Sequence, residues 1–431
     1  MNHKKASINN NYIEWLVAIA VAYATSFIIL ESYFQEYMPI FRTISGIMRS
    51  VVILLLLHYQ IEHYGLNLRK KSFFYFFILY CLYIFYYIVF LPLVKIEFVA
   101  GVPGSQTGSI MPFLYRSLQV IGYLLCAETI LKNMKPLKYV IISFFCAVIP
   151  SFLFIQYEGV EALQILEKDD LGFSRLALGY CNVYSLVISV IFLKNIYNRD
   201  VLTFLFTILN IVLVIYILIM GGERGPIFWG IADLFICFFL LSKNKIRYVL
   251  LMSIFGFLLY FNVDTVVKGL DSIAPRAAEK IRKTVIEGDT NGRFDVENED
   301  GSLYIIGLKQ FLTSPIYGSY YRLVGSGQRY MGAYPHNIFI EVLMTMGLLG
   351  FIPFMSFLYN GYKKVNKVMK RRQYTESQLC CLIFFLLTFL QFQTTWSIVA
   401  SASFWLFFYL MCIFDCKIEE RVETNHNIAK H

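Results

Sequence analysis

Long apolar runs alternate with short polar segments along almost the whole chain. A helix that crosses a membrane needs about 20 mostly apolar residues to cover roughly 30 Å of hydrocarbon. The segments that meet this requirement lie at approximately 12–30, 40–58, 72–94, 111–131, 137–157, 173–193, 201–220, 225–241, 246–263, 335–359, 378–393 and 396–415. The last two are close together, so the pattern predicts an all-α, polytopic membrane protein with about twelve, and at least ten, transmembrane helices.

Basic residues occupy alternate connections between these runs. The basic clusters lie at 4–5, 69–71, 132–138, 194–199, 243–247 and 363–372. The intervening short loops are neutral or acidic, as at 31–36 and 158–170. Because Lys and Arg in short loops are retained on the cytoplasmic side, this alternation predicts cytoplasmic termini and an external segment 264–334. We therefore divide the chain into a membrane domain of nine spans (1–263), an extracytoplasmic lid (264–334), and a membrane domain of three spans with a cytoplasmic tail (335–431).

Composition supports a membrane protein and excludes several soluble classes. Of 431 residues, 58% are hydrophobic and 16% are charged, whereas a soluble chain of this length needs a more charged surface. This excludes a soluble two-domain enzyme, a disordered protein and a small disulfide-rich secreted domain. The charges that give a net +9 lie mostly in clusters between the apolar runs, as orientation signals do, so we expect no nucleic-acid partner.

Cysteine usage and the first apolar run narrow the class further. The nine cysteines lie mostly inside apolar segments and form no CxxC pair, which argues against a disulfide framework and a structural zinc site. The first apolar run is long, and no small-residue cleavage site follows it. We therefore expect a retained first span and no cleavable signal peptide.

The external segment 264–334 contains two helical patterns. Residues 275–287 begin with a Pro suited to a first helical turn and continue with helical spacing of apolar residues. Residues 302–313 stop before Ser314-Pro315, where a helix normally ends. One face of this second helix consists of Leu303, Ile306, Gly307, Gln310 and Phe311. We predict a folded lid whose second helix is amphipathic and able to lie on the membrane surface.

Of the six histidines, only His336 falls on the predicted outer side, in Tyr334-Pro335-His336-Asn337 at the start of the tenth span. Two interpretations remain open for it. His336 is either a polar helix cap, a role that Asn337 fills equally well, or a group that accepts a proton at physiological pH.

Arginines predicted to lie on the same side as His336 favour its interpretation as a proton acceptor. Arg224 lies in the turn Gly221 to Pro226, Arg293 lies in the lid, and Arg175 precedes Asn182 near the outer start of the sixth span. Taken singly, each is also explained as a snorkelling or surface arginine. Together with an external His they suit an anionic diphosphate, because guanidinium groups bind phosphate oxygens in a bidentate manner and stay charged.

These motifs resemble those of a known family. Gly292-Arg293, the stretch Leu312 to Gly318 and the stretch Pro335 to Gly350 resemble the signature of the O-antigen ligase/O-antigen polymerase family. The turn Glu223-Arg224-Gly225 and the stretch Arg175 to Asn182 resemble its upstream motifs. The resemblance spans roughly 171–351. The family's twelve-span layout, with one large periplasmic loop before the His-bearing helix, is similar to the pattern of the whole chain.

The resemblance implies a glycosyltransferase that uses an undecaprenyl-diphosphate-linked oligosaccharide as donor and transfers it to a glycan acceptor, with no metal and no cofactor. It implies that Arg224 and Arg293 hold the diphosphate, with Arg175 as a further cation, and that His336 is the general base. The secondary candidates are Glu223, Asn182, Asn337 and Glu341. The chain departs from the family pattern in an acidic insert after Arg293 and in Tyr180-Cys181-Asn182.

Three functions are compatible with these features of the sequence. The first is a polymerase that joins lipid-linked repeat units into O-antigen, capsular or exopolysaccharide on the outer face of a bacterial cytoplasmic membrane, with a flippase and a chain-length regulator as candidate partner proteins. The second is a ligase that transfers the glycan to lipid A core or another acceptor. The third is a transporter of the same lipid-linked sugar, in which Arg42, Arg49 and Arg116 line a pathway.

Overall fold

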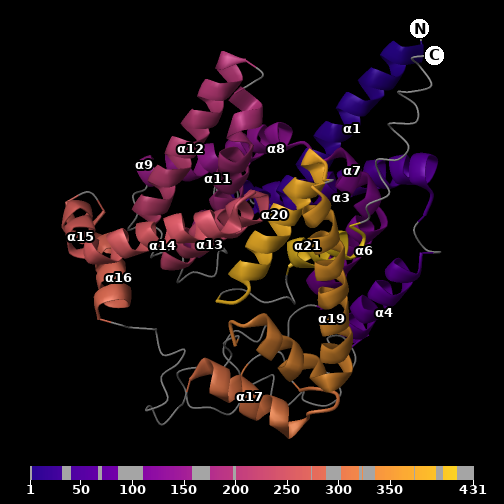
Figure 1. Ribbon diagram of the computed structural model, residues 1–431. Coiled ribbons are helices and arrows are strands. Elements are labelled where there is room, and N and C mark those ends of the chain that lie inside the picture. Colours follow the sequence, from indigo (N-terminus) through magenta and orange to yellow (C-terminus); the bar gives the residue numbers. More distant parts are fainter. Residues whose placement is uncertain are drawn as a thin grey trace.

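The computed structural model contains only helices as regular elements in the residues that it describes (Figure 1). These residues are 2–31, 40–66, 70–85, 110–157, 175–197, 200–272, 274–287, 302–319, 323, 335–372, 374–394 and 401–414. The predicted all-α class is therefore confirmed for this part of the chain.

The helices follow the predicted apolar segments closely. In the first half of the chain they are α1 (Asn2–Thr25), α3 (Phe41–Tyr64), α4 (Lys71–Phe85), α6 (Ile110–Leu125), α7 (Ala127–Asn133), α8 (Pro136–Ser143), α9 (Ile149–Tyr157), α11 (Arg175–Tyr197) and α12 (Val201–Gly221). In the second half they are α13 (Arg224–Leu241), α14 (Lys245–Phe261), α15 (Val263–Asp271), α16 (Pro275–Ile281), α17 (Leu303–Thr313), α19 (Ile338–Arg371), α20 (Glu376–Gln391) and α21 (Ala402–Cys412). A π-helical turn, Phe144–Val148, joins α8 to α9, and a second one, Arg282–Ile286, follows α16.

A described helix lies in each of the twelve predicted segments, but fewer helices qualify as membrane spans by themselves. Within the described residues, five are long and apolar enough to cross a membrane: Thr43–Tyr64, Pro136–Tyr157, Val201–Gly221, Arg224–Leu241 and Ile338–Arg371. Lys245–Leu258 and Val263–Asp271 meet at 59°, a geometry that fits either one broken span, which would be the sixth, or a re-entrant loop. Other apolar helices, such as α4 and α20, are shorter than a span requires. The chain is thus an all-α membrane protein, and the number twelve stays a prediction.

The centre of the molecule is built from α20 and α21, which are apolar and buried on nearly all sides. The Trp405 ring of α21 lies 5.1 Å from the ring of Tyr80 on α4, and the Phe408 ring lies 5.2 Å from that of Phe354 on α19. A helix that is apolar all round is stable only when other helices surround it. These two short helices are therefore core elements, whatever their position relative to the membrane.

Segments predicted to be cytoplasmic contact one another. Lys138, after the fourth predicted span, pairs with Glu14 of α1 at 2.6 Å. Lys70, after the second, pairs with Glu128 at 2.7 Å. The backbone N–H of Met134 donates to Ser377 Oγ at the start of α20 over 2.7 Å. These contacts bring together the connections at 69–71 and 132–138 with α1 and the start of α20, and the side of the membrane stays a prediction.

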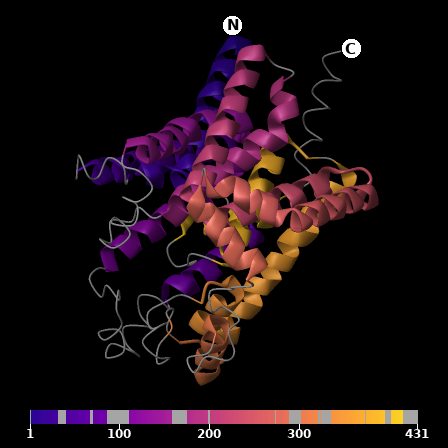
Figure 2. The ribbon, with the colours of Figure 1, turned by 90° about the vertical axis from the view of Figure 1, so that its left-hand side faces the viewer.

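The predicted external helix α17 lies at the opposite end from the beginning of α1. Two perpendicular views place α17 and the adjoining end of α19 far from the N-terminal end of α1 (Figures 1 and 2). Leu303, Ile306, Gly307 and Gln310 are the buried residues of α17, which confirms the predicted face except for the half-buried Phe311. This face packs on α19, because a Cβ atom on Gly307 would lie 2.7 Å from Ile340 Cγ2.

Candidate active site

The turn between α12 and α13 presents Arg224 at a helix start. Helix α12 ends at Gly221, and Gly222 closes it in the left-handed region (φ 63°) with its N–H donating to Leu218 O over 3.2 Å. A left-handed residue after a helix is usually glycine, since glycine has no Cβ to clash. Helix α13 begins at Arg224, and Pro226 fits its first turn because the first N–H groups of a helix have no intrahelical acceptor.

Close packing against α11 fixes this turn. A Cβ on Gly225 would lie 2.2 Å from the Tyr180 hydroxyl oxygen, and a Cβ on Gly179 would lie 2.4 Å from Pro226 Cγ. Small residues allow two helices to approach in this way. The start of α11 around Gly179 and Tyr180 and the turn around Arg224 therefore pack as one unit. The role of Gly179 in it is steric.

The charges at this turn favour an anionic ligand. Arg224 occupies the first position of α13, where the positive end of the helix dipole disfavours a cation and favours an anion. Glu223 is engaged by Lys280 of the lid helix α16, whose ammonium group lies 2.5 Å from its carboxylate, and both side chains are about four-fifths buried. Lys280 could not be identified from the sequence, because its partner lies 57 residues away. The ion pair holds α16 over the turn.

The start of α19 assigns separate roles to His336 and Asn337. The Asn337 side chain caps the helix, since its Oδ1 accepts from the N–H groups of Phe339 and Ile340 over 3.0 and 3.2 Å. His336 is half-buried and lies in the left-handed region with φ 50°. Of the two interpretations of His336, capping is therefore wrong, because Asn337 fulfils that role.

The turn that ends α20 connects the two helix starts. Asn337 Nδ2 donates to Gln393 Oε1 over 3.2 Å, and Trp229 Nε1 of α13 donates to Thr394 Oγ1 over 2.6 Å. Tyr304 of α17 also donates to the Gln393 carbonyl, over 3.3 Å. Since Trp229 lies only about 7.5 Å along α13 from Arg224, the arginine turn, the start of α19 and the lid helix α17 belong to one assembly. The polar residues Gln391, Gln393, Thr394 and Thr395 at the end of an apolar segment are the sequence signal that could have indicated this.

A break in α19 explains two further motif stretches. The predicted span 335–359 was continuous, but α19 runs to Arg371 and is broken at Gly347 (φ 59°, ψ −159°). Met344 O accepts from Ser319 N over 2.6 Å, Leu348 N donates to Pro315 O over 2.9 Å, and Leu349 N donates to Ile316 O over 3.0 Å. Segment 315–319 thus replaces the helical hydrogen bonds lost at the break and attaches the end of the lid to α19.

The remaining predicted residues lie in different places. Glu341 is buried in the first turn of α19, where a carboxylate suits the helix dipole. Asn182 is fully buried and donates to Ser151 Oγ of α9 and to Leu178 O, both over 2.8 Å, so its amide nitrogen serves helix packing. Arg293 and the side chain of Arg175 lie outside the described residues.

The described part of the site offers fixed positive charge, a helix start and a half-buried imidazole. These groups can bind an anionic leaving group and receive a proton. Among the described residues, no three His, Cys, Asp or Glu side chains are grouped as metal ligands. No protein-family model matches the chain, and no curated protein matches it.

Proposed function

We propose that the chain is a membrane glycosyltransferase that polymerises undecaprenyl-diphosphate-linked repeat units on the outer face of a bacterial cytoplasmic membrane. The observation that supports this most strongly is the guanidinium group of Arg224 at the first position of α13, because the N–H groups and the dipole at a helix start favour an anion there. It belongs to the same assembly as His336, joined through the turn at Gln393 and Thr394.

In the proposed reaction an acceptor hydroxyl attacks the anomeric carbon of the donor. The bond from this carbon to the phosphate oxygen breaks, and undecaprenyl diphosphate leaves with the bonding electrons. Arg224, together with Arg293 and Arg175, stabilises the negative charge that develops on the leaving oxygen, a type of interaction worth about 3 kcal/mol per donor. His336 removes the proton of the acceptor hydroxyl, which contributes roughly 10²–10⁴-fold.

A ligase uses the same leaving group, so transfer of the glycan to a lipid A core acceptor is the alternative within this chemistry. A transporter receives less support. Arg49, one of the arginines considered for a pathway, is bound to Glu31 at 2.9 Å and to Gln119 at 3.2 Å. A charge with such partners is accounted for by structural pairing.

The test is substitution of Arg224 in purified protein supplied with a lipid-diphosphate donor. We expect Arg224→Lys to lose about 10²–10³-fold in turnover, nearly as much as Arg224→Ala, because an ammonium group cannot form the bidentate contact. Arg371→Lys, an exposed arginine at the far end of α19, is the matched control and should retain normal turnover. Normal transfer by Arg224→Lys at normal protein level would remove the basis of the proposal.

A further inference from the structure

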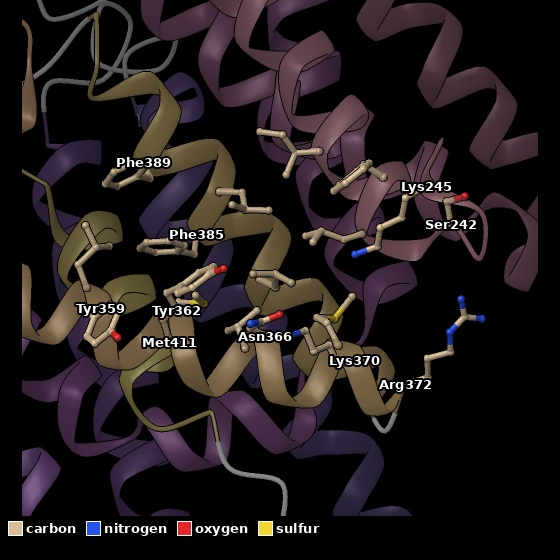
Figure 3. A pocket seen from close by; sticks show the side chains of 18 of the residues that line it. Ser242, Lys245, Tyr359, Tyr362, Asn366, Lys370, Arg372, Phe385, Phe389 and Met411 are labelled. Atoms are coloured by element: carbon tan, nitrogen blue, oxygen red, sulfur yellow. The ribbon is translucent and has the colours of Figure 1, made fainter. Parts of the chain in front are cut away.

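A large pocket lies between the α13–α14 connection, α19 and α20 (Figure 3). Its volume is about 1180 Å³, above the roughly 300–1,000 Å³ typical of pockets for small ligands. It lies toward the C-terminal end of α19, whereas His336 precedes the other end. The basic end of the pocket therefore lies away from His336, whereas its apolar end includes Phe389, whose ring lies 5.9 Å from that of Phe339 in the first turn of α19.

The pocket is divided into an apolar and a basic part. Phe385 and Phe389 of α20 and Tyr359 of α19 lie toward one end, whereas Lys245 and Arg372 lie toward the other (Figure 3). Aliphatic side chains from all three elements complete the wall, including Ile236, Leu240, Leu358, Val365 and Leu386. A ligand that fills this pocket therefore needs a long apolar part and a polar end.

The basic end carries four cations, namely Lys243, Lys245, Lys370 and Arg372. Within the described part of the chain, none of them lies within ion-pair distance of a carboxylate. The C-terminal dipole of α19 accounts for Lys370. It does not account for Lys245, which stands at the start of α14, where the dipole disfavours a cation. This concentration of positive charge suits an anionic group.

We infer that this pocket binds an anionic glycerophospholipid, with an acyl chain along the aromatic and aliphatic wall and the phosphate at the four cations. Both basic segments, 243–247 and 363–372, belong to the connections predicted to be cytoplasmic, so the lipid comes from the inner leaflet. Basic pockets between helices on this side of a membrane are suited to anionic headgroups. Tyr362 and Asn366 lie between the two ends on α19 and can donate to the glycerol ester oxygens (Figure 3).

The headgroup part is tested by binding to purified full-length protein in a neutral detergent. Phosphatidylglycerol and phosphatidylcholine are titrated separately, and bound lipid is counted by native mass spectrometry. We expect phosphatidylglycerol to bind at least about tenfold more tightly. The double variant Lys370→Gln/Arg372→Gln should weaken it about 30-fold, at roughly fivefold per cation. The control Lys367→Gln/Arg371→Gln removes the same charge from exposed positions outside the pocket and should change binding by less than about threefold.

The apolar part is tested by filling the pocket. Leu386→Trp places an indole in the space for the acyl chain and should reduce phosphatidylglycerol binding. Leu390→Trp, on the same helix but outside the pocket, should not. Equal binding of the two lipids by wild-type protein, or equal losses in a variant and its control, would overturn the inference. Displacement of phosphatidylglycerol by a polyprenyl-diphosphate donor would also overturn it, because the donor chain would then be the natural occupant.

Discussion

At the scale of single residues, two features of His336 matter: its left-handed backbone conformation, with φ 50°, and its imidazole ring. A left-handed φ costs a residue with a Cβ roughly 1–2 kcal/mol, and the adjacent Asn337 already caps α19. The cap therefore does not explain a histidine at this position, and the left-handed backbone, in which Asn, Asp and His are all enriched, does not select histidine over asparagine. An observed backbone outlier of this kind is grounds for a functional hypothesis, and proton transfer is the chemistry that an imidazole offers.

The first prediction separates the imidazole from the backbone at this position. Asn adopts the left-handed region more readily than Ala, so His336→Asn should fold as well as wild type, whereas His336→Ala should lose about 1 kcal/mol of stability. Both should reduce single-turnover transfer by roughly 10²–10⁴-fold. The measurements are transfer from a lipid-diphosphate donor and the apparent melting temperature in detergent.

Asn337→Ala is the control for this pair. Loss of the cap should cost about 0.5–2 kcal/mol of stability, while the turnover of the folded fraction falls much less than in His336→Asn. Wild-type turnover in His336→Asn would assign His336 to the scaffold and direct the search for a base to Glu341 or Glu223.

At the scale of elements, helix ends could be predicted wherever their signals are local. Ser302 caps α17, its Oγ accepting from Ile305 N over 3.2 Å, and the helix ends before Ser314-Pro315 as the sequence indicated. The end of α12 at Gly221 and Gly222 could also be predicted, because two consecutive glycines after an apolar run indicate a turn. The break at Gly347 was not predictable, because the groups that satisfy its hydrogen bonds come from residues 315–319. From the sequence alone, an apolar run that contains one glycine is indistinguishable from a continuous helix, because the contact with segment 315–319 is not visible there.

The second prediction concerns this break. Gly347 has φ 59° and ψ −159°, a region open almost only to glycine, and a Cβ there would lie 2.5 Å from Ile316 C and O. Backbone strain alone should make Gly347→Ala destabilising by about 1–3 kcal/mol. The clash should also detach segment 315–319, so proteolysis within residues 302–319 should become faster.

Gly256 of α14 supplies the matched control. A Cβ on Gly256 meets no atom within 4 Å, so Gly256→Ala should be neutral or stabilising by up to about 1 kcal/mol through helix propensity. Melting temperatures and proteolysis rates in detergent measure both variants. A Gly347→Ala protein as stable and as resistant as Gly256→Ala would show that the break is not required.

At the scale of the whole molecule, the contacts described above join segments that are predicted to lie on the same side of the membrane. Lys280 of the lid joins the α12–α13 turn through Glu223, and Tyr304 of α17 joins the end of α20. At the other end, Lys70 and Lys138 pair with Glu128 and Glu14. Charge alternation predicts such a division because it is a property of loops along the chain, and the side of the membrane stays a prediction. It could not anticipate which residues would meet, since that depends on how helices distant in sequence pack.

The last prediction follows from this division and tests the sidedness on which the proposed reaction depends. Lys309 of α17 and Lys367 of α19 are both exposed, and they lie in segments predicted for opposite sides of the membrane. A membrane-impermeant maleimide should label Lys309→Cys in intact cells, whereas Lys367→Cys should be labelled only after permeabilisation. The wild-type chain sets the background, because the cysteines that the structure describes are buried or half-buried. Labelling of Lys309→Cys only after permeabilisation would place His336 and Arg224 on the cytoplasmic side. A donor presented on the outer face could not reach them there, and the lipid pocket would then face the outer leaflet.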